Sequence, residues 1–491
     1  MGIDVDRTEF SAQDYQHFNG VLEQNLQSLR GLLANPGFGV GPASMGAELE
    51  VYIVDHRGLP LSINQELLAE AADPQLTLEL NRYNLEYNLS PRAMGDTAFR
   101  HTEDEILTKL SALRVLAARM GGRIVPIGIL PTLKQSDFGP HCLTDRKRYH
   151  ALVAQLIKRR GSAFKIDIFG DDPLALDMAD ITLEGANTSF QVHYRVAPRD
   201  YADTFNAIQL VTPLVVAIGA NSPTLFGHQL WHETRIPLFK QSIDTRRLDR
   251  YGWKEPARVS YGHGWVRQGA EELFREAVRL YPPLLPIVAK SASPADGSAA
   301  PSLAELRLHQ STVWPWNRPV YDDADGGHLR IEMRALPAGP TAVDMVANAA
   351  LIIGLAEGIR PHIKELLPAL PFQMADYNFY RAAQYGLDAK LVWPHLDKNV
   401  CSEESVTTII ERLLPIAREG LAAIGTAEAE SSRYLGIIEE RLEARQSGAV
   451  WQKNRLAALN RVLEPEEALH HMLEDFMRYS ETNLPVARWP L

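Results

Sequence analysis

The sequence predicts an α+β protein, and three observations support that class. Four stretches far apart in the chain alternate apolar and polar residues with the period of two that half-buried β-strands show. Segments with a helical spacing of apolar residues lie between these strands. Beyond residue 375 the pattern is almost entirely helical, with helices expected at residues 403–422, 428–445 and 464–478. We therefore expect a sheet that packs against helices and is followed by a helical C-terminal part.

The clearest two-faced strand runs from His328 to Ala335. One face holds Leu329, Ile331, Met333 and Ala335, and the other holds Arg330, Glu332 and Arg334. For this strand alone, a charged face exposed to solvent is a commoner arrangement than a ligand-binding cleft. After a turn rich in proline, Thr341 and Asp344 predict a capped helix that can lie on the apolar back of the strand.

A second strand, Met45 to Val54, carries Glu48 and Glu50 on the same side. Residues at i and i+2 of a strand point the same way, so the two carboxylates are neighbours. Glutamate is a poor strand former. Two glutamates side by side on a pleated surface therefore indicate a reason beyond intrinsic propensity.

The segment from Leu76 to Pro91 carries two further acids, Glu79 and Glu86. Leu85, Tyr87 and Leu89 lie opposite Glu86, as expected for a strand with one apolar face. Glu79 and Glu86 have opposite parity along the chain. Both can face one site only if the stretch of residues 81–83 turns or bulges.

The fourth two-faced strand is expected over Thr182 to Val196. Its apolar side holds Phe190, Val192, Tyr194 and Val196, and its polar side holds Ser189, Gln191, His193 and Arg195. A single histidine on a strand is usually a hydrogen-bonded structural residue. Its value as a candidate ligand therefore depends on the other three strands.

The remaining elements are predicted more simply. Helices are expected at residues 11–34, 102–120, 146–160, 200–217 and 269–288, and a further strand at Arg123 to Ile129. Residues 131–145 are irregular, and residues 220–250 are expected to be a long loop rich in polar and aromatic side chains. Residues 291–302, SASPADGSAAPS, are expected to be a surface loop and not a linker between domains.

Composition excludes several classes of protein. The chain of 491 residues has a net charge of -11 and no basic face, which argues against a nucleic-acid binder. The longest apolar runs, residues 207–220 and 347–355, are too short to span a bilayer. The N-terminus resembles no targeting signal, and the only cysteines, Cys142 and Cys401, have no metal-ligand spacing. We expect a cytoplasmic protein without structural disulfides.

The four strands share one design, with apolar residues behind and acids with one histidine in front. If they belong to one sheet, the shared face holds Glu48, Glu50, Glu86, His193 and Glu332, and a turn would add Glu79. Two carboxylates about 4 Å apart repel by ~4 kcal/mol at an effective dielectric near 20, so several need cations to stay ionised together. Oxygen ligands with one imidazole suit Mg²⁺ or Mn²⁺ better than zinc. Any single glutamate is more often solvated, but four such strands favour a metal site that could hold nucleotide phosphates.

At this point the residues resemble a known family. The segments GAELEVYIVD at 46–55 and LEYN at 85–88 are similar to the metal-binding strands of the glutamate–cysteine ligases, in the glutamine synthetase superfamily. The resemblance continues through IVPIGILP at 124–131, RY at 148–149, QVHYRV at 191–196, ANSP at 220–223, Gly227, Arg235 and LRIEMR at 329–334. Each piece is short, and the order and spacing of the pieces make the match specific.

This resemblance implies a curved, mainly antiparallel sheet of the glutamine-synthetase type, with helices on its outer face, that binds Mg²⁺ or Mn²⁺, ATP and an amino acid. The implied metal ligands are Glu48, Glu50, Glu79, Glu86, His193 and Glu332. The implied catalytic residues are Arg235 and Arg334, and the implied cofactor-binding residues are Arg330, Gln191 and Asn221. The family's usual glycine-rich stretch before the second acidic strand is replaced here by ELNRYN, and WPWNRPVY at 314–321 lies outside the pattern. The latter could form a lid or a pocket particular to a subfamily.

The resemblance also implies an activity and a division of the chain. We expect residues 1–400 to form a catalytic domain and residues 401–491 a helical extension packed on it. The implied reaction is the ATP-dependent joining of the γ-carboxylate of glutamate to the amine of cysteine, as in the first step of glutathione synthesis. The alternatives are the same chemistry with another acid or amine, or a non-catalytic relative that binds metal or nucleotide.

Overall fold

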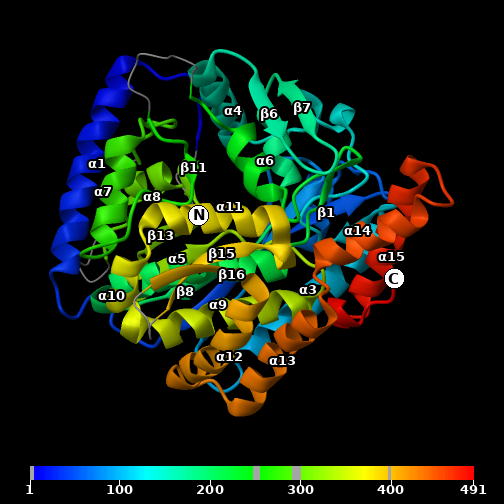
Figure 1. Ribbon diagram of the computed structural model, residues 1–491. Coiled ribbons are helices and arrows are strands. Elements are labelled where there is room, and N and C mark those ends of the chain that lie inside the picture. The colour runs from blue at the N-terminus through cyan, green and yellow to red at the C-terminus, as the bar shows by residue number, and fades with distance from the viewer. Residues whose placement is uncertain (1–4, 247–254, 290–299, 396–399) are drawn as a thin grey trace.

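The computed structural model describes residues 5–246, 255–289, 300–395 and 400–491 (Figure 1). The helices are α1 (Ala12–Leu33), α2 (Asn64–Ala71), α3 (Ala98–Arg119), α4 (Lys147–Arg160), α5 (Tyr201–Gly219), α6 (Arg235–Ser242), α7 (Ala270–Leu280), α8 (Ala304–Gln310), α9 (Ala342–Ile359), α10 (Ile363–Leu366), α11 (Phe372–Tyr385), α12 (Val406–Ala423), α13 (Glu428–Ala444), α14 (Gly448–Leu459) and α15 (Pro465–Glu481).

The strands are shorter and lie mainly in the first three quarters of the chain. They are β1 (Ser44–Val54), β2 (Leu76–Leu78), β3 (Asn84–Asn88), β4 (Arg92–Ala93), β5 (Arg123–Val125), β6 (Phe164–Ile168), β7 (Leu174–Met178), β8 (Phe190–Arg195), β9 (Thr224–Leu225), β10 (His228–Gln229), β11 (Val259–Ser260), β12 (Trp314–Pro315), β13 (Asn317–Asp322), β14 (His328–Met333), β15 (Lys390–His395) and β16 (Val400–Ser405).

One sheet holds the four expected strands. Its order is β13-β14-β8-β1-β3-β2, with β4 and β5 also paired to β1, and every pair in it is antiparallel. On the apolar side α9 packs on β8, α3 on β5 and α5 on β13. The expected class, an antiparallel sheet with helices on its outer face, is therefore confirmed.

Helix α9 is the centre of the helical layer. It begins as expected, with the Thr341 hydroxyl accepting a hydrogen bond from the Asp344 amide. The helix packs on β8 of the sheet and is buried on nearly all sides, because α5, α12 and α13 also pack against it (Figure 1). Gly354 meets Gly420 of α12 so closely that a Cβ on Gly420 would lie 2.0 Å from the Gly354 carbonyl oxygen.

The C-terminal helices share one hydrophobic core with the sheet. Arg441 of α13 is buried and pairs with Asp344 of α9 at 2.9 Å. Residues 401–491 therefore pack on the preceding part of the chain. Position 400 itself lies within the hairpin β15–β16, so the expected division at residue 400 crosses a pair of bonded strands.

Several sequence-based boundaries were wrong. Residues 182–186 form a 3₁₀ helix ahead of β8, because the Asp180 carboxylate accepts from the Thr182 amide and hydroxyl and starts a turn. Helix α7 ends at Leu280, since Tyr281 precedes proline and is driven out of the helical region. The expected long loop at 220–250 contains the hairpin β9–β10 and helix α6, whose Pro237 sits in the first turn where its missing N–H costs little.

Two further expectations change with the structure. The stretch at residues 314–321 is no lid, because it supplies β12 and most of the edge strand β13, with Trp316 buried between them. The region beyond residue 375 is interrupted by the hairpin β15–β16. The expected surface loop at 291–302 and the end of the 220–250 segment lie largely outside the described residues.

The apolar runs judged too short for a bilayer lie in longer helical stretches. Residues 198–219 and 342–369 meet the length and composition of a membrane span, and 89% and 94% of their most apolar windows are buried inside the fold. Packing against the sheet and the C-terminal helices accounts for their apolar composition.

We expect Arg441→Met to lower the free energy of unfolding by about 3 kcal/mol, because it leaves the buried Asp344 carboxylate without its cation. The matched control is Arg488→Met, which breaks an exposed pair with Glu440 and should cost less than about 1 kcal/mol. Urea unfolding followed by circular dichroism measures both. Equal losses for the two variants would contradict the role given to the Arg441–Asp344 pair.

Candidate active site

Strand register brings the expected acids together on one face of the sheet. Glu332 of β14 stands opposite His193 of β8, and Glu50 of β1 stands opposite Glu86 of β3. Residues directly opposite in an antiparallel pair share a face. Two groups result, each with its ligand atoms within 4.8 Å of one another. The first is Glu48, His193 and Glu332, and the second is Glu50, Glu79 and Glu86.

The first group is bounded by arginines. His193 Nε2 lies 3.0 Å from Glu48 Oε1, and its buried Nδ1 has no hydrogen-bond partner among the described residues. Glu332 accepts from Arg318 at 2.9 Å and from Arg334 at 2.7 Å. Burial alone would raise the pKa of Glu332, but these two guanidiniums hold it well below its usual range. The solvent-exposed face expected for this strand is wrong, because the Glu332 side chain is 0% exposed.

The second group has less positive charge around it. Strand β2 ends at Leu78, and the chain turns over residues 80–83, so Glu79 joins Glu50 and Glu86 as the sequence required. Burial, followed by the charges of Glu50 and Glu184, raises the pKa of Glu79 well above its usual value. Burial, followed by Glu48 and Glu79, does the same for Glu86. Without a cation these carboxylates favour their neutral forms.

Both groups fit a hard divalent cation. Together they offer five carboxylates and one imidazole, the donor set that Mg²⁺ and Mn²⁺ accept. The raised pKa values of Glu79 and Glu86 show that the protein alone supplies too little positive charge for the second group. The residues present therefore fit the metal site that the sequence predicted.

Arg334 lies between the two groups. Its guanidinium donates to Glu332 and to the side-chain oxygen of Gln191, and Gln191 in turn donates to Glu50 at 3.1 Å. Burial raises the pKa of Glu50 above its usual value, and the charges of Arg235 and Arg334 offset part of that rise. Gln191 thus holds Arg334 and Glu50 in a fixed relation.

Arg235 and Asn221 lie deeper than the sequence suggested. Arg235 is buried and pairs with Glu233 at 3.1 Å, with a further bond to the Ala335 carbonyl. Asn221 is fully buried and donates to the Ala338 carbonyl, while it accepts from Gln452 of α14. The hydrogen-bonding groups of Asn221 are therefore paired within the protein, whereas the buried Nε of Arg235 has no hydrogen-bond partner among the described residues. The geometry of both side chains suits the support of the site's walls better than contact with a ligand.

A pocket of about 200 Å³ beyond Glu332 is lined by four arginines. They are Arg148, Arg307, Arg318 and Arg330, with Ser311 and Tyr321 among the other lining residues. Three of them, Arg307, Arg318 and Arg330, pair with Asp323, Glu332 and Asp322 respectively. Arg148 donates to Ser311 at 2.9 Å and has no carboxylate partner in the described part of the chain. The pocket therefore carries positive charge suited to an anion.

Sequence reasoning missed Arg318 and Glu184. Arg318 stands opposite Glu332 on the edge strand β13, whose register no sequence period could reveal. Glu184 lies in the 3₁₀ helix before β8, where its charge acts on Glu50 and Glu79. Burial, followed by Glu50, raises the pKa of Glu184 to about 8. A recognised turn at Asp180 would have been the only sequence signal for its position.

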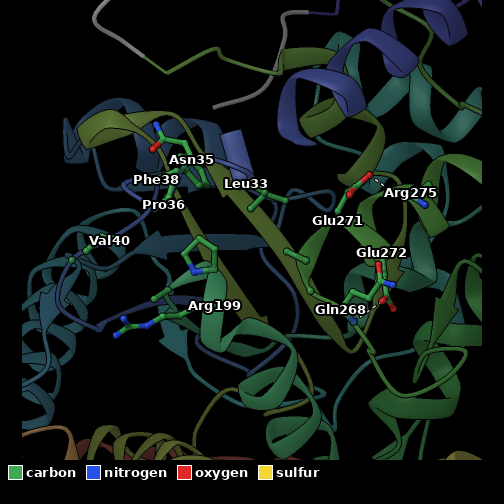
Figure 2. A pocket seen from close by; sticks show the side chains of 15 residues that line it. Leu33, Asn35, Pro36, Phe38, Val40, Arg199, Gln268, Glu271, Glu272 and Arg275 are labelled. Carbon is green, nitrogen blue, oxygen red and sulfur yellow. Dashed lines mark hydrogen bonds and ion pairs between the residues drawn. The ribbon is translucent and has the colours of Figure 1, made fainter. Parts of the chain in front are cut away.

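A separate cavity of about 370 Å³ lies between the end of α1 and the start of α7 (Figure 2). Its lining includes Leu33, Phe38 and Val40 on one side and Glu271 and Arg275 on the other. Figure 2 shows Glu271 and Arg275 paired with each other, and Glu271 also pairs with Arg30 at 2.7 Å. Glu271 is therefore already neutralised, unlike the acids of the second group on the sheet.

The chain is similar to several known proteins. A protein of Frankia alni with the provisional name glutamate–cysteine ligase 2-1 is 23% identical over 393 residues, which cover 76% of this chain and 83% of that protein. A protein of Mycolicibacterium vanbaalenii, provisionally named glutamate–cysteine ligase 2-2, is 26% identical over 196 residues, or 38% and 46% of the two chains. The crystal structure of Francisella tularensis glutamate–cysteine ligase in complex with AMP superposes with a TM-score of 0.52 at 12% identity, covering 91% of this chain and 90% of that one.

The antiparallel sheet, with its helices on one face and acids on the other, defines a ligase fold of the glutamine-synthetase type. The chain belongs to glutamate–cysteine ligase family 2, whose family model matches residues 44–468. The matched range includes both groups of acids. It also includes most of the C-terminal helices, which lie beyond the motifs found in the sequence.

The raised pKa values predict how pH affects the metal-free protein. A folded-state pKa above the unfolded value of about 4.5 gives stability that is full below that pH and is lost as pH rises through the folded pKa. In EDTA, Glu79→Gln combined with Glu86→Gln should therefore stabilise the protein, by about 1 kcal/mol or more at pH 8 and by less at pH 5. Thermal melting at the two pH values measures this difference.

The control for that experiment is Glu66→Gln, an acid in the first turn of α2, away from the two groups. It should shift the melting temperature equally little at both pH values. A double variant whose gain is the same at pH 5 and pH 8 would show that Glu79 and Glu86 do not repel their neighbours in the folded protein.

Proposed function

We propose that this protein is an ATP-dependent carboxylate–amine ligase that joins the γ-carboxylate of glutamate to the amine of cysteine. The observation that carries this proposal is the pair of acid groups on one face of the sheet with Arg334 between them. Membership of the glutamate–cysteine ligase family supports it, as does the AMP bound to the Francisella structure of the same fold.

The reaction needs activation of a carboxylate, because its oxygen is a poor leaving group. A γ-carboxylate oxygen attacks the terminal phosphorus of ATP, and the bond from that phosphorus to ADP breaks. The amine then attacks the acyl phosphate carbon, phosphate leaves with the bonding electrons, and the amine loses a proton to form the amide. No nucleophilic side chain is required, which agrees with a buried, unassigned Cys142.

The six residues of the two groups, Glu48, Glu50, Glu79, Glu86, His193 and Glu332, would hold Mg²⁺ or Mn²⁺. When bound, such ions would offset the charge of the phosphates of ATP. Arg334 directs its planar guanidinium toward the space between the groups and would stabilise charge on the transferred phosphoryl oxygens. Gln191 keeps that guanidinium in place.

The other expected residues take supporting parts in this proposal. The arginine-lined pocket continues from Glu332 by way of Arg318, and there Arg330 and Arg148 would attract the anionic phosphates of the nucleotide. Arg235 would act as a positioning residue, since its charge offsets part of the rise in the pKa of Glu50 that burial causes, while its own hydrogen bonds go to the protein. Asn221 would hold the segment that follows α5 against α14, through its hydrogen bond with Gln452.

A panel of amines tests the function directly. With Mg²⁺, ATP and glutamate present, we expect ADP and phosphate to form at a rate that depends on cysteine and less on other amines. A different preferred amine would keep the ligase chemistry and change the acceptor. Binding of ATP without any amine-dependent formation of ADP would contradict the ligase assignment.

Two substitutions on β14 test the division of roles. Arg334→Lys keeps the charge and loses the planar fork, so kcat should fall by an order of magnitude or more, equivalent to ~1.4 kcal/mol. The Mg²⁺ requirement should change little. Glu332→Gln should instead raise the Mg²⁺ concentration needed for half-maximal rate and weaken ATP binding with it. Titration of both variants with Mg²⁺ measures these effects. Equal shifts in the Mg²⁺ requirement of the two variants would contradict the separate roles given to Arg334 and Glu332.

A further inference from the structure

One carboxylate on the active face belongs to neither metal group. Glu184 lies in the 3₁₀ helix Thr182–Ala186, directly before β8, and is partly buried. Its charge acts on Glu50 and Glu79, so it faces the second group of acids. Its ligand atoms nevertheless lie outside both sets that could share an ion. A metal ion held by either group of acids would therefore not account for the presence of Glu184 on this face.

The position of Glu184 is fixed by the backbone around it. Its amide donates to the Ile181 carbonyl at 2.9 Å, and its own carbonyl accepts from the Asn187 side chain at 2.8 Å. Gly185 packs directly on Asn81, where a Cβ would come within 2.3 Å of the Asn81 amide nitrogen. Asn81 also donates to the Thr182 carbonyl at 2.9 Å. Glu184 is thus held against the same turn that carries Glu79.

The carboxylate of Glu184 lacks donors within the protein. Among the residues that the structure describes, none donates a hydrogen bond or an ion pair to it, and Arg334 is the one cation whose charge acts on it. A buried structural acid of the same fold, Glu233, does have hydrogen-bond donors within the protein. Glu233 is buried nearby and accepts from Asn221, Ser222 and Arg235. Glu184 therefore has its acceptor oxygens available to a ligand.

We propose that Glu184 binds the α-ammonium group of the acid substrate. This inference rests on the ligase function proposed above and names the residue that distinguishes glutamate from a plain dicarboxylate. An ammonium group supplies three donors and the positive charge that this corner of the site lacks. The acceptor amine fits less well, because it must be neutral to attack the acyl phosphate and cannot keep a charge-assisted bond to Glu184.

The test compares glutamate with glutarate, which has the same two carboxylates and no amine. Calorimetry with the enzyme saturated with Mg²⁺ and a non-hydrolysable ATP analogue gives both affinities. Glu184→Gln should lower the affinity for glutamate by about tenfold or more and leave the affinity for glutarate nearly unchanged. Glu184→Asp, which keeps the charge, should restore part of the preference. The matched control Glu276→Gln removes a partly buried acid of raised pKa in α7, which belongs to neither group of acids, and should change neither affinity.

Other results would overturn the inference. If Glu184→Gln lowered the affinities for glutamate and glutarate equally, Glu184 would be a structural residue. An unchanged preference for glutamate, with a raised KM for the amine, would assign Glu184 to the acceptor. If wild-type enzyme turned over glutamate normally while Glu184→Gln kept its selectivity, only this inference would fail. If wild-type enzyme bound neither acid, the proposed function would fail with it.

Discussion

Repulsion between carboxylates gathered on one buried face governs the architecture of this protein. Glu50 stands directly opposite Glu86, and Glu79 is turned toward both. At a few ångströms such charges cost several kcal/mol unless they are neutralised. The protein neutralises Glu332 with Arg318 and Arg334, and leaves Glu79 and Glu86 with raised pKa values. That imbalance is what a bound cation would correct.

Holding such charges in place requires a rigid support. The apolar side of the sheet packs on α9, α3 and α5, and the C-terminal helices surround α9 in turn. Close contact between Gly354 and Gly420 and the buried Arg441–Asp344 pair fasten those helices. One link reaches the site itself, where Gln452 of α14 bonds to Asn221. The helical C-terminal region is thus part of the scaffold that positions the acids.

The family model matches residues 44–468, a range that includes both the acids of the sheet and the side chains around them. The two relatives are only 23% and 26% identical to this chain, and side-chain pockets vary most among proteins that share a fold. The edge strand β13 lies within the matched range, although the family motifs found in the sequence did not include it, and it supplies Arg318 against Glu332. Among the side chains of the site, Glu184 is the one to which we assign the choice of the acid substrate.

The fold class and most of the candidate ligands follow from local patterns in the sequence. Alternation with a period of two is such a pattern, and it is enough to place Glu48 beside Glu50 and Glu332 beside Arg334 on one face of their strands. Strand register is not local. The folded chain alone sets Glu332 opposite both His193 and Arg318, turns Glu79 toward Glu86, and buries Arg235 and Asn221. These positions depend on turns and on the pairing of strands, and the paired residues are more than 100 residues apart in several cases, as with Glu48 and Gln191.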